Sequence, residues 1–406
     1  MPLGSVLQGL TLLAVVVLGS LIAGNLFRRI GQPRVLGPIT LGIAVGTAIA
    51  ACPESVRAGL VPPTSRYLLE AAGTAGLLLL MFLVGTELRT FGRSDDAAFG
   101  WRLVPCVVLP IVVCALAALP FAHVLGKPGH TEHYGWLFVG VALGVTAVPV
   151  LVTIIADLGI GSLPVASSAL RIAVVTDGVA WILVTAMVIA TTNVSAVSIP
   201  ALAAGAALLL AVTVVVPRVV ERTELLQQGG LLAVVLAGSA LAGAEATQFL
   251  GFHPAIGAVI AGFFFPAGVA DAVPRRTFTA VVDVLLPAFF VSSAMSVPLQ
   301  ALRDQASWAV LGCLAALVVA AVASKVAVGV MFGAFHRWPW RSSARLGVLL
   351  NCRGVTEIAI ASVGFQAGLV SAFGFAALCA LAIVTTAATA PLYRALADDV
   401  HEVSRS

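Results

Sequence analysis

Charged side chains are scarce in this 406-residue chain: 10% of the residues are charged and 60% are hydrophobic. Soluble globular domains carry about 25% charged residues. No stretch of the sequence is both polar enough and long enough to form a separate soluble domain. Such a chain places its apolar surface in lipid, so we expect an all-α polytopic membrane protein in contact with the bilayer.

Motifs of several enzyme classes are missing as well. The six cysteines form no CxxC pair and no cluster with zinc spacing. There is no nucleotide-binding loop, nucleophile elbow or His-Glu-x-x-His helix. An intramembrane aspartyl protease needs two facing aspartates, and only Asp177 lies at mid-membrane depth. We therefore expect no enzyme, no cofactor, no metal beyond a transported cation and, despite the net charge of +4, no nucleic-acid partner.

Apolar runs of about 20 residues recur along the chain, which is the length of a helix that crosses a bilayer core of about 30 Å. We predict about 13 transmembrane helices in a domain covering residues 1–397, followed by a short cytoplasmic tail at 398–406. The predicted spans are residues 3–27, 34–51, 67–89, 101–122, 135–156, 165–191, 199–217, 229–249, 253–266, 280–298, 307–333, 344–366 and 372–396.

Basic residues concentrate in alternate loops between these spans. Arg28, Arg29 and Arg34 follow the first span, which is too long and lacks the basic start of a signal peptide. Cytoplasmic loops carry the excess of arginine and lysine in membrane proteins. We therefore expect a multi-pass protein of the cell membrane with its N-terminus outside and its C-terminus in the cytoplasm.

Two spans carry helix-breaking residues near their middles. The span at 135–156 contains Pro149, which lacks a backbone N–H, and the span at 344–366 contains Gly354 within the polar sequence 351–357. The two spans are an odd interval apart, so they cross the membrane in opposite directions. This pattern favours an inverted repeat with two crossing broken helices. The alternative is a proline kink together with a buried polar cluster.

Asp177 lies near the midplane of the span at 165–191. Ionisable groups at this depth are costly and usually functional, because desolvation disfavours the charged form. Either a proton or a cation neutralises such a carboxylate. If access alternates between the two sides of the membrane, the two ions compete and exchange results. The alternative is a permanent structural ion pair with Lys325 or Arg353.

Two threonines are candidates to assist Asp177. Thr176 precedes it, and Thr146 lies at the break of the span at 135–156. Hydroxyl oxygens suit hard cations such as sodium or potassium. Thr146 is also well placed to cap the half-helix that begins near Pro149.

Three further charged residues lie inside spans. Lys325 is too deep in its span to be a terminal lysine, and we expect it to form an ion pair. Arg353 and Glu357 are four residues apart, so they can pair if the backbone is helical. Arg353 would alternatively offset the negative C-terminal end of a half-helix. Direct contact between Glu357 and the cation is a further alternative.

Several motifs, taken in order, resemble the monovalent cation:proton antiporters, the sodium/hydrogen exchanger-like group that includes bacterial antiporters and plant cation/proton exchangers. The resemblance covers nearly the whole chain. The matching segments are residues 30–33, 41–46, 80–88, 141–150, 176–181, 252–262, 286–293 and 351–357, together with Lys325.

The resemblance implies a homodimer in which an elevator-like core moves against a scaffold. It implies that Asp177 binds proton or cation, with Thr146 and Thr176 as oxygen ligands and Lys325 as the intramembrane lysine. Asn351, with Arg353 and Glu357, matches the second broken helix. The chain is also expected to lack the nucleotide-binding regulatory domains of some relatives.

One residue departs from the family pattern. Relatives often carry aspartate or asparagine where this chain has Thr176. Thr176 supplies no charge to Lys325, which then needs another partner or is neutral, and this favours electroneutral exchange. The sequence therefore predicts a secondary antiporter that exchanges sodium or potassium for protons. A gated potassium-efflux protein and a sodium-coupled symporter of the same fold remain the alternatives.

Overall fold

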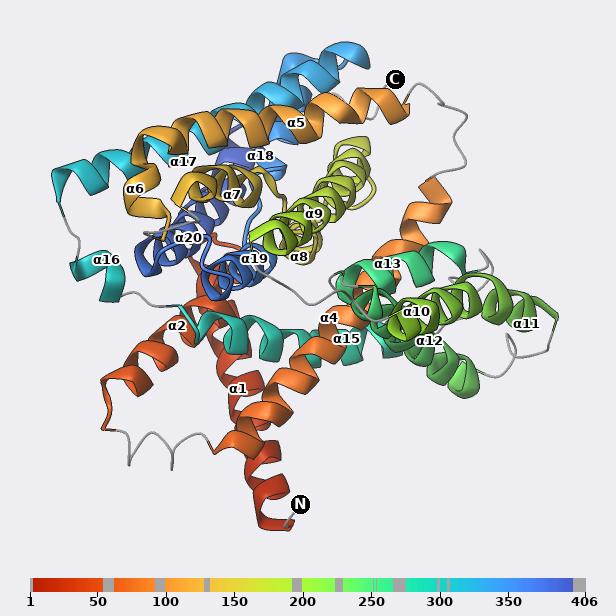
Figure 1. Cartoon of the computed structure of the whole chain (residues 1–406). Helices are drawn as coiled ribbons and strands as arrows, with labels where there is room; N and C mark the ends of the chain where they lie inside the picture. Colours follow the sequence, from red (N-terminus) through yellow and green to blue (C-terminus); the bar gives the residue numbers. More distant parts are fainter. Residues whose placement is uncertain are drawn as a thin grey trace. The chain divides into compact units, whose positions relative to one another are not determined.

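The computed structural model describes residues 3–53, 62–91, 99–127, 132–191, 199–222, 229–250, 252, 254–265, 275–297, 300–304 and 307–396. Within these ranges the chain is helical and contains no strand, so the predicted all-α class is confirmed (Figure 1). The chain divides into two compact units. The first unit comprises Met1–Ser20, Ala48–Asp96 and Thr192–Ser292, and the second comprises Leu21–Thr47, Ala97–Thr191 and Ser293–Ser406.

The first unit is a group of helices, two of which pack closely against each other. Its helices are α4 (Pro63–Phe91), α10 (Ile199–Leu210), α11 (Val216–Arg222), α12 (Gly229–Phe249), α13 (Pro254–Phe264) and most of α15 (Arg275–Ala294), with the start of α1 (Leu3–Arg29). A Cβ atom on Gly243 would lie 2.5 Å from the carbonyl oxygen of Gly257. Glycines at this contact therefore let α12 and α13 approach closely, as small residues do between membrane helices.

The second unit holds all the candidate site residues. Its helices are the first part of α2 (Leu36–Ala51), α5 (Phe99–Ala118), α6 (Ala122–Leu125), α7 (Glu132–Gly144), α8 (Val148–Leu158), α9 (Pro164–Thr191), α16 (Gln300–Asp304), α17 (Trp308–Phe335), α18 (Trp340–Leu349), α19 (Val355–Gln366) and α20 (Ala372–Ala395). The long helices α5 and α17 lie side by side, with α7 packed on α5 and α18 packed on α17 (Figure 1).

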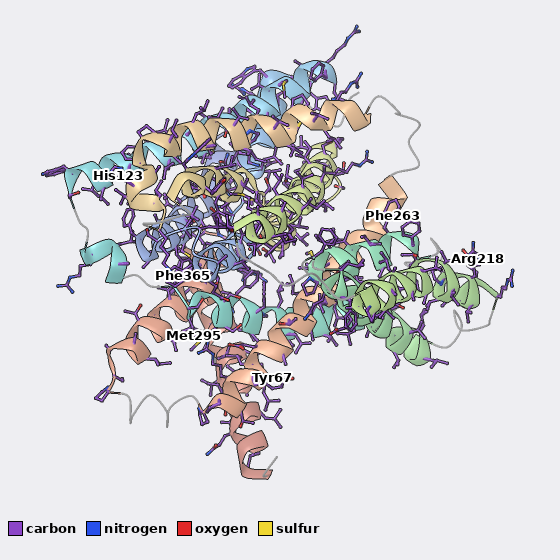
Figure 2. The ribbon with its side chains drawn as sticks, in the orientation of Figure 1. Tyr67, His123, Arg218, Phe263, Met295 and Phe365 are labelled. Carbon is purple, nitrogen blue, oxygen red and sulfur yellow. The ribbon has the colours of Figure 1, made fainter. Side chains whose placement is uncertain are left out.

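Apolar side chains cover the outer faces of many helices. Ile22, Val234 and Val319 are 71%, 68% and 66% exposed. Tyr67 and Phe365, labelled in Figure 2, are also exposed. Apolar surface of this extent suits lipid rather than water, in agreement with a multi-pass membrane protein.

The number of membrane crossings is not confirmed. Among the described residues, nine helical segments are long and apolar enough to cross a membrane. Leu36–Ala51, Pro254–Phe264 and Ala280–Ala294 are apolar but shorter. The predicted count of about 13 therefore stays a prediction, and the predicted tail at 398–406 lies outside the described residues.

Candidate functional site

Two helices of the second unit are interrupted where the sequence places helix-breaking residues. α7 ends at Gly144 and α8 begins at Val148, with Pro149 as its second residue. α18 ends at Leu349 and α19 begins at Val355. Each interruption frees backbone groups that a continuous helix would satisfy. The partners of these groups define the site.

The two interruptions are hydrogen-bonded to each other. The backbone N–H of Ala147 donates to the carbonyl oxygen of Cys352 over 2.9 Å. The hydroxyl of Thr146 donates to the carbonyl oxygen of Leu350 over 2.8 Å. The broken helices therefore cross at their breaks, as the sequence predicts.

Gly354 permits the close approach of the two breaks. A Cβ atom at this position would lie 2.5 Å from Cγ2 of Val150 on α8. The valine side chain is fully buried and has no room to move away. The glycine is therefore needed for packing at the residue that directly precedes α19.

Two buried cations face the C-terminal end of α7. The last carbonyl groups of a helix lack partners inside it and carry the negative end of its dipole. Arg353 donates from Nη2 to the carbonyl oxygen of Leu143. Lys325 donates from Nζ to the carbonyl oxygen of Gly144 and, over 3.0 Å, to the hydroxyl of Thr146. Main-chain oxygens thus hold both groups in part. Lys325 forms no ion pair within the described residues, so the ion pair predicted for it is wrong, and a carbonyl and a hydroxyl take the place of the carboxylate.

Arg353 also pairs with Glu357, which lies four residues later in the first turn of α19. The Nη1 to Oε1 distance is 3.2 Å, and both side chains are 1% exposed. The guanidinium group therefore connects the carboxylate of α19 to the carbonyl end of α7, so that both partners considered from the sequence are present together.

The backbone of the second break is held by Thr386 on α20. Its hydroxyl accepts from the N–H of Arg353 over 2.8 Å and donates to the carbonyl oxygen of Arg353 over 2.6 Å. One hydroxyl thus satisfies both main-chain groups of an unwound residue. Sequence reasoning missed Thr386, because this threonine lies in an apolar helix and, unlike Thr176 and Thr146, adjoins neither a charged residue nor a helix break.

Asp177 lies on the buried face of α9. It is 7% exposed, and buried residues recur before and after it at the three- and four-residue spacing of one helical face, from Ala169 to Val184. α9 packs against all four half-helices, α7, α8, α18 and α19 (Figure 1). The carboxylate is therefore directed into the protein and not toward lipid.

Asp177 forms no ion pair with Lys325 or Arg353 in the part of the chain that the structure describes. Its Oδ1 atom is buried without a hydrogen-bond partner among the same residues. The alternative of a permanent structural pair is therefore wrong for this structure. A buried carboxylate oxygen without a donor remains open to a proton or a cation.

The two candidate threonines have different hydrogen bonds. Thr176 donates to the carbonyl oxygen of Ala173 over 2.9 Å within its own helix, which leaves its lone pairs free. Thr146 does not cap α8: the N-cap residue is Ala147, and no side chain caps it. The capping prediction is wrong, because the hydroxyl of Thr146 instead bonds Leu350 and Lys325 across the crossing.

Secondary transporters form ion sites from interrupted helices that cross beside buried ionisable groups, and these features place the chain in that class. A sequence model described as "Sodium/hydrogen exchanger, transmembrane" matches residues 14–395. The chain belongs to this family, whose characterised relatives are transporters and not enzymes.

Individual relatives are similar to this chain in sequence along most of its length. The chain is 30% identical to the Na(+)/H(+) antiporter NhaS4 of Synechocystis, with 93% of this chain and 94% of that protein covered. It is 28% identical to Cation/H(+) antiporter 20 of Arabidopsis thaliana over 94% of this chain and 48% of the relative. It thus spans about half the length of the plant proteins that it matches.

A solved structure supports the fold. The sodium proton antiporter MjNhaP1 of Methanocaldococcus jannaschii matches with a TM-score of 0.65 at 14% identity, over 96% of this chain and 97% of that one. At this identity the match concerns the fold alone. It confirms the sodium/proton antiporter fold predicted from the sequence.

Lys325 offers a first test of the site. Replacing it by methionine, which has a similar length, should lower the free energy of unfolding by about 1–3 kcal/mol, because the Gly144 carbonyl and the Thr146 hydroxyl lose their donor. Thermal unfolding in detergent measures this loss, and Lys127→Met, at an exposed residue, is the matched control. Selective loss of one transported ion with normal thermal stability would contradict this role.

Proposed function

We propose that the chain exchanges a monovalent cation, sodium or potassium, for protons across the membrane, with Asp177 as the group that binds either ion. The observation that carries this proposal is a buried carboxylate that forms no ion pair with the residues that the structure describes, on the helix that packs against both broken helices. Relatives named as Na(+)/H(+), K(+)/H(+) and Na(+)/H(+)-K(+) antiporters support it.

Burial of Asp177 makes the two ions competitors. An isolated carboxylate in a medium of low polarity is strongly disfavoured, so the empty site is the costly state. A proton or a cation removes that cost, and one carboxylate does not hold both. If the site opens to one side of the membrane at a time, each ion displaces the other and the two fluxes are coupled.

The hydrogen bonds indicate which hydroxyl assists Asp177. Thr146 already donates to Leu350 and accepts from Lys325. Thr176 uses only its proton, in its bond to Ala173. Its oxygen therefore keeps two lone pairs for a cation, and Thr146 keeps one.

The charges of the buried residues favour one cation for one proton. Arg353 and Glu357 neutralise each other, and Lys325 is held by a carbonyl and a hydroxyl that do not depend on what Asp177 binds. A neutral amine would make the same two hydrogen bonds, so the proposal is that Lys325 keeps one protonation state through the cycle and Asp177 alone changes occupancy. The loaded site carries the same charge with a proton as with a monovalent cation.

Electroneutral exchange is therefore the expected result in proteoliposomes. With sodium as the driving ion, the rate of proton movement should change by less than about twofold when valinomycin imposes a membrane potential of either sign, since a net charge would respond at about 2.3 kcal/mol per 100 mV. A rate that rises with one polarity and falls with the other would show net charge movement and contradict this stoichiometry.

A cation panel tests the function itself. Sodium, potassium and lithium are added in turn to proteoliposomes with a preformed pH gradient, and collapse of the gradient by one of them and not by choline supports exchange. Proton flux in the same direction as the cation would instead indicate the symport alternative. Potassium flux without proton coupling would indicate the efflux alternative.

The assembly and orientation belong to the same proposal. A homodimer in the cell membrane, with its N-terminus outside and its C-terminus in the cytoplasm, is supported by the resemblance to dimeric antiporters and by the arginine-rich alternate loops. Mass measurement in a mild detergent and labelling of single cysteines introduced at each terminus in intact cells test these two points.

A further inference from the structure

Two buried oxygen atoms on the second broken helix have no hydrogen-bond partner in the described part of the chain. Among the described residues, Oδ1 of Asn351 and Oε2 of Glu357 are buried without a hydrogen bond. The side chains are 4% and 1% exposed. Both residues lie in the stretch 351–357 between α18 and the first turn of α19.

The carboxamide of Asn351 has a defined orientation. Its Nδ2 donates to the carbonyl oxygen of Gly347 over 2.9 Å. A carbonyl group only accepts, so the amide nitrogen is on this side and the oxygen is on the other. Oδ1 is thus the free acceptor of a side chain that its Nδ2 holds to the end of α18.

The carboxylate of Glu357 is satisfied at one atom only. Arg353 binds Oε1 through Nη1, and its Nη2 is occupied by the carbonyl oxygen of Leu143. Oε2 makes no hydrogen bond to this guanidinium, whose Nε is also buried without a partner among the described residues. A carboxylate normally accepts several hydrogen bonds, and one bare oxygen at 1% exposure is unusual.

Both atoms are oxygen acceptors, which is the donor chemistry that hard cations prefer. Asp177 adds a third unpartnered oxygen, from a helix that packs on both α18 and α19. A single carboxylate does not fill the coordination shell of an alkali cation, so further oxygens are required near it.

We propose that Asn351 Oδ1 and Glu357 Oε2 are ligands of the transported monovalent cation, so that the second broken helix supplies part of the cation site. This inference rests on the proposed exchange function. It assigns these residues to cation affinity and selectivity, whereas Asp177 holds both the cation and the proton.

Two substitutions of Asn351 separate a ligand from a structural residue. Asn351→Ala and Asn351→Asp both remove the Nδ2 donor to Gly347, but only the aspartate keeps an oxygen at the Oδ1 position. In proteoliposomes, Asn351→Ala should raise the apparent KM for the cation about tenfold, which corresponds to about 1.4 kcal/mol. Its maximal rate should change by less than about twofold. Asn351→Asp should stay within about threefold of the wild-type KM.

Glu357→Gln tests the second ligand. Glutamine keeps an oxygen for Arg353 and places an amide NH₂ where Oε2 was, so it should raise the apparent KM for the cation and change the order of preference among sodium, potassium and lithium. Asn25→Ala and Glu70→Gln are matched controls at exposed residues, and both should keep the wild-type KM.

Cation binding can also be measured by thermal unfolding in detergent, which serves for variants that reconstitute poorly into proteoliposomes. Saturating cation, compared with choline, should raise the thermal unfolding temperature of the wild type and of Asn351→Asp in detergent, and raise that of Asn351→Ala much less. An equal rise in the apparent KM, or an equal loss of the cation-dependent stabilisation, in the alanine and aspartate variants would overturn the inference in favour of a structural role. Wild-type KM in both would show that water and not the cation meets these oxygens. Absence of exchange by the wild type with every cation would instead refute the proposed function.

Discussion

Replacing Asp177 by asparagine should reduce cation-driven proton movement in proteoliposomes to the level of protein-free vesicles. Asparagine is nearly the same size, so the packing of α9 is retained. It neither binds a proton at its oxygen nor carries the charge that attracts a cation, so both halves of the exchange are lost together. The measurement is the collapse of a preformed pH gradient on addition of sodium or potassium.

The matched control is Asp157→Asn at the end of α8. Asp157 is a carboxylate of the same unit, but it is partly exposed and pairs with Arg34, with 3.3 Å between Nε and Oδ1. An ion pair at a surface contributes little, so this variant should keep exchange close to that of the wild type. Intact exchange in Asp177→Asn, or equal losses in the two variants, would show that the ion site has been assigned to the wrong residue.

Replacing Arg353 by alanine should produce the largest loss of stability among single substitutions in the site, about 3–5 kcal/mol. The change leaves the carboxylate of Glu357 buried without its partner and removes the donor of the Leu143 carbonyl. It also opens a cavity, because Arg353 is among the largest fully buried side chains of the described residues. Thermal and denaturant unfolding in detergent measure the loss.

A second substitution distinguishes charge from volume. In the double variant Arg353→Met/Glu357→Leu both charges are absent, so stability should recover by more than half of the loss seen with Arg353→Ala. Arg394→Ala, which removes an exposed guanidinium that donates to the Gly31 carbonyl, is the control and should cost less than about 1 kcal/mol. If Arg353→Ala is as stable as the control, the ion pair does not hold the crossing together.

The sequence predicted the positions of the two breaks because helix interruption is a local property. Pro149 removes a backbone donor, and the polar stretch at 351–357 contains a glycine, so the evidence lies within a few residues of each break. The burial of Asp177 was predictable for a similar reason, since the residue lies in the middle of a long apolar run.

The hydrogen-bond partners of the buried charged residues could not be predicted from the local sequence. Lys325 binds a carbonyl and a hydroxyl that lie 181 and 179 positions away in the chain. Every residue has a carbonyl group, so no sequence pattern distinguishes the one that meets a buried cation. The same holds for Thr146: the local sequence favours a helix cap, but in the structure its hydroxyl bonds Leu350 and Lys325, which are distant in the chain.

The bonds between the two breaks restrict how the site moves. Ala147 is hydrogen-bonded to Cys352, and Thr146 is hydrogen-bonded to Leu350. The side chain of Arg353 donates to the carbonyl oxygen of Leu143. If one interrupted helix moved along the other, several of these hydrogen bonds would have to break at the same time. We propose that the crossed helices move together as one rigid body when the Asp177 carboxylate is exposed to alternate sides of the bilayer, so a chemical cross-link between the two breaks should leave turnover intact.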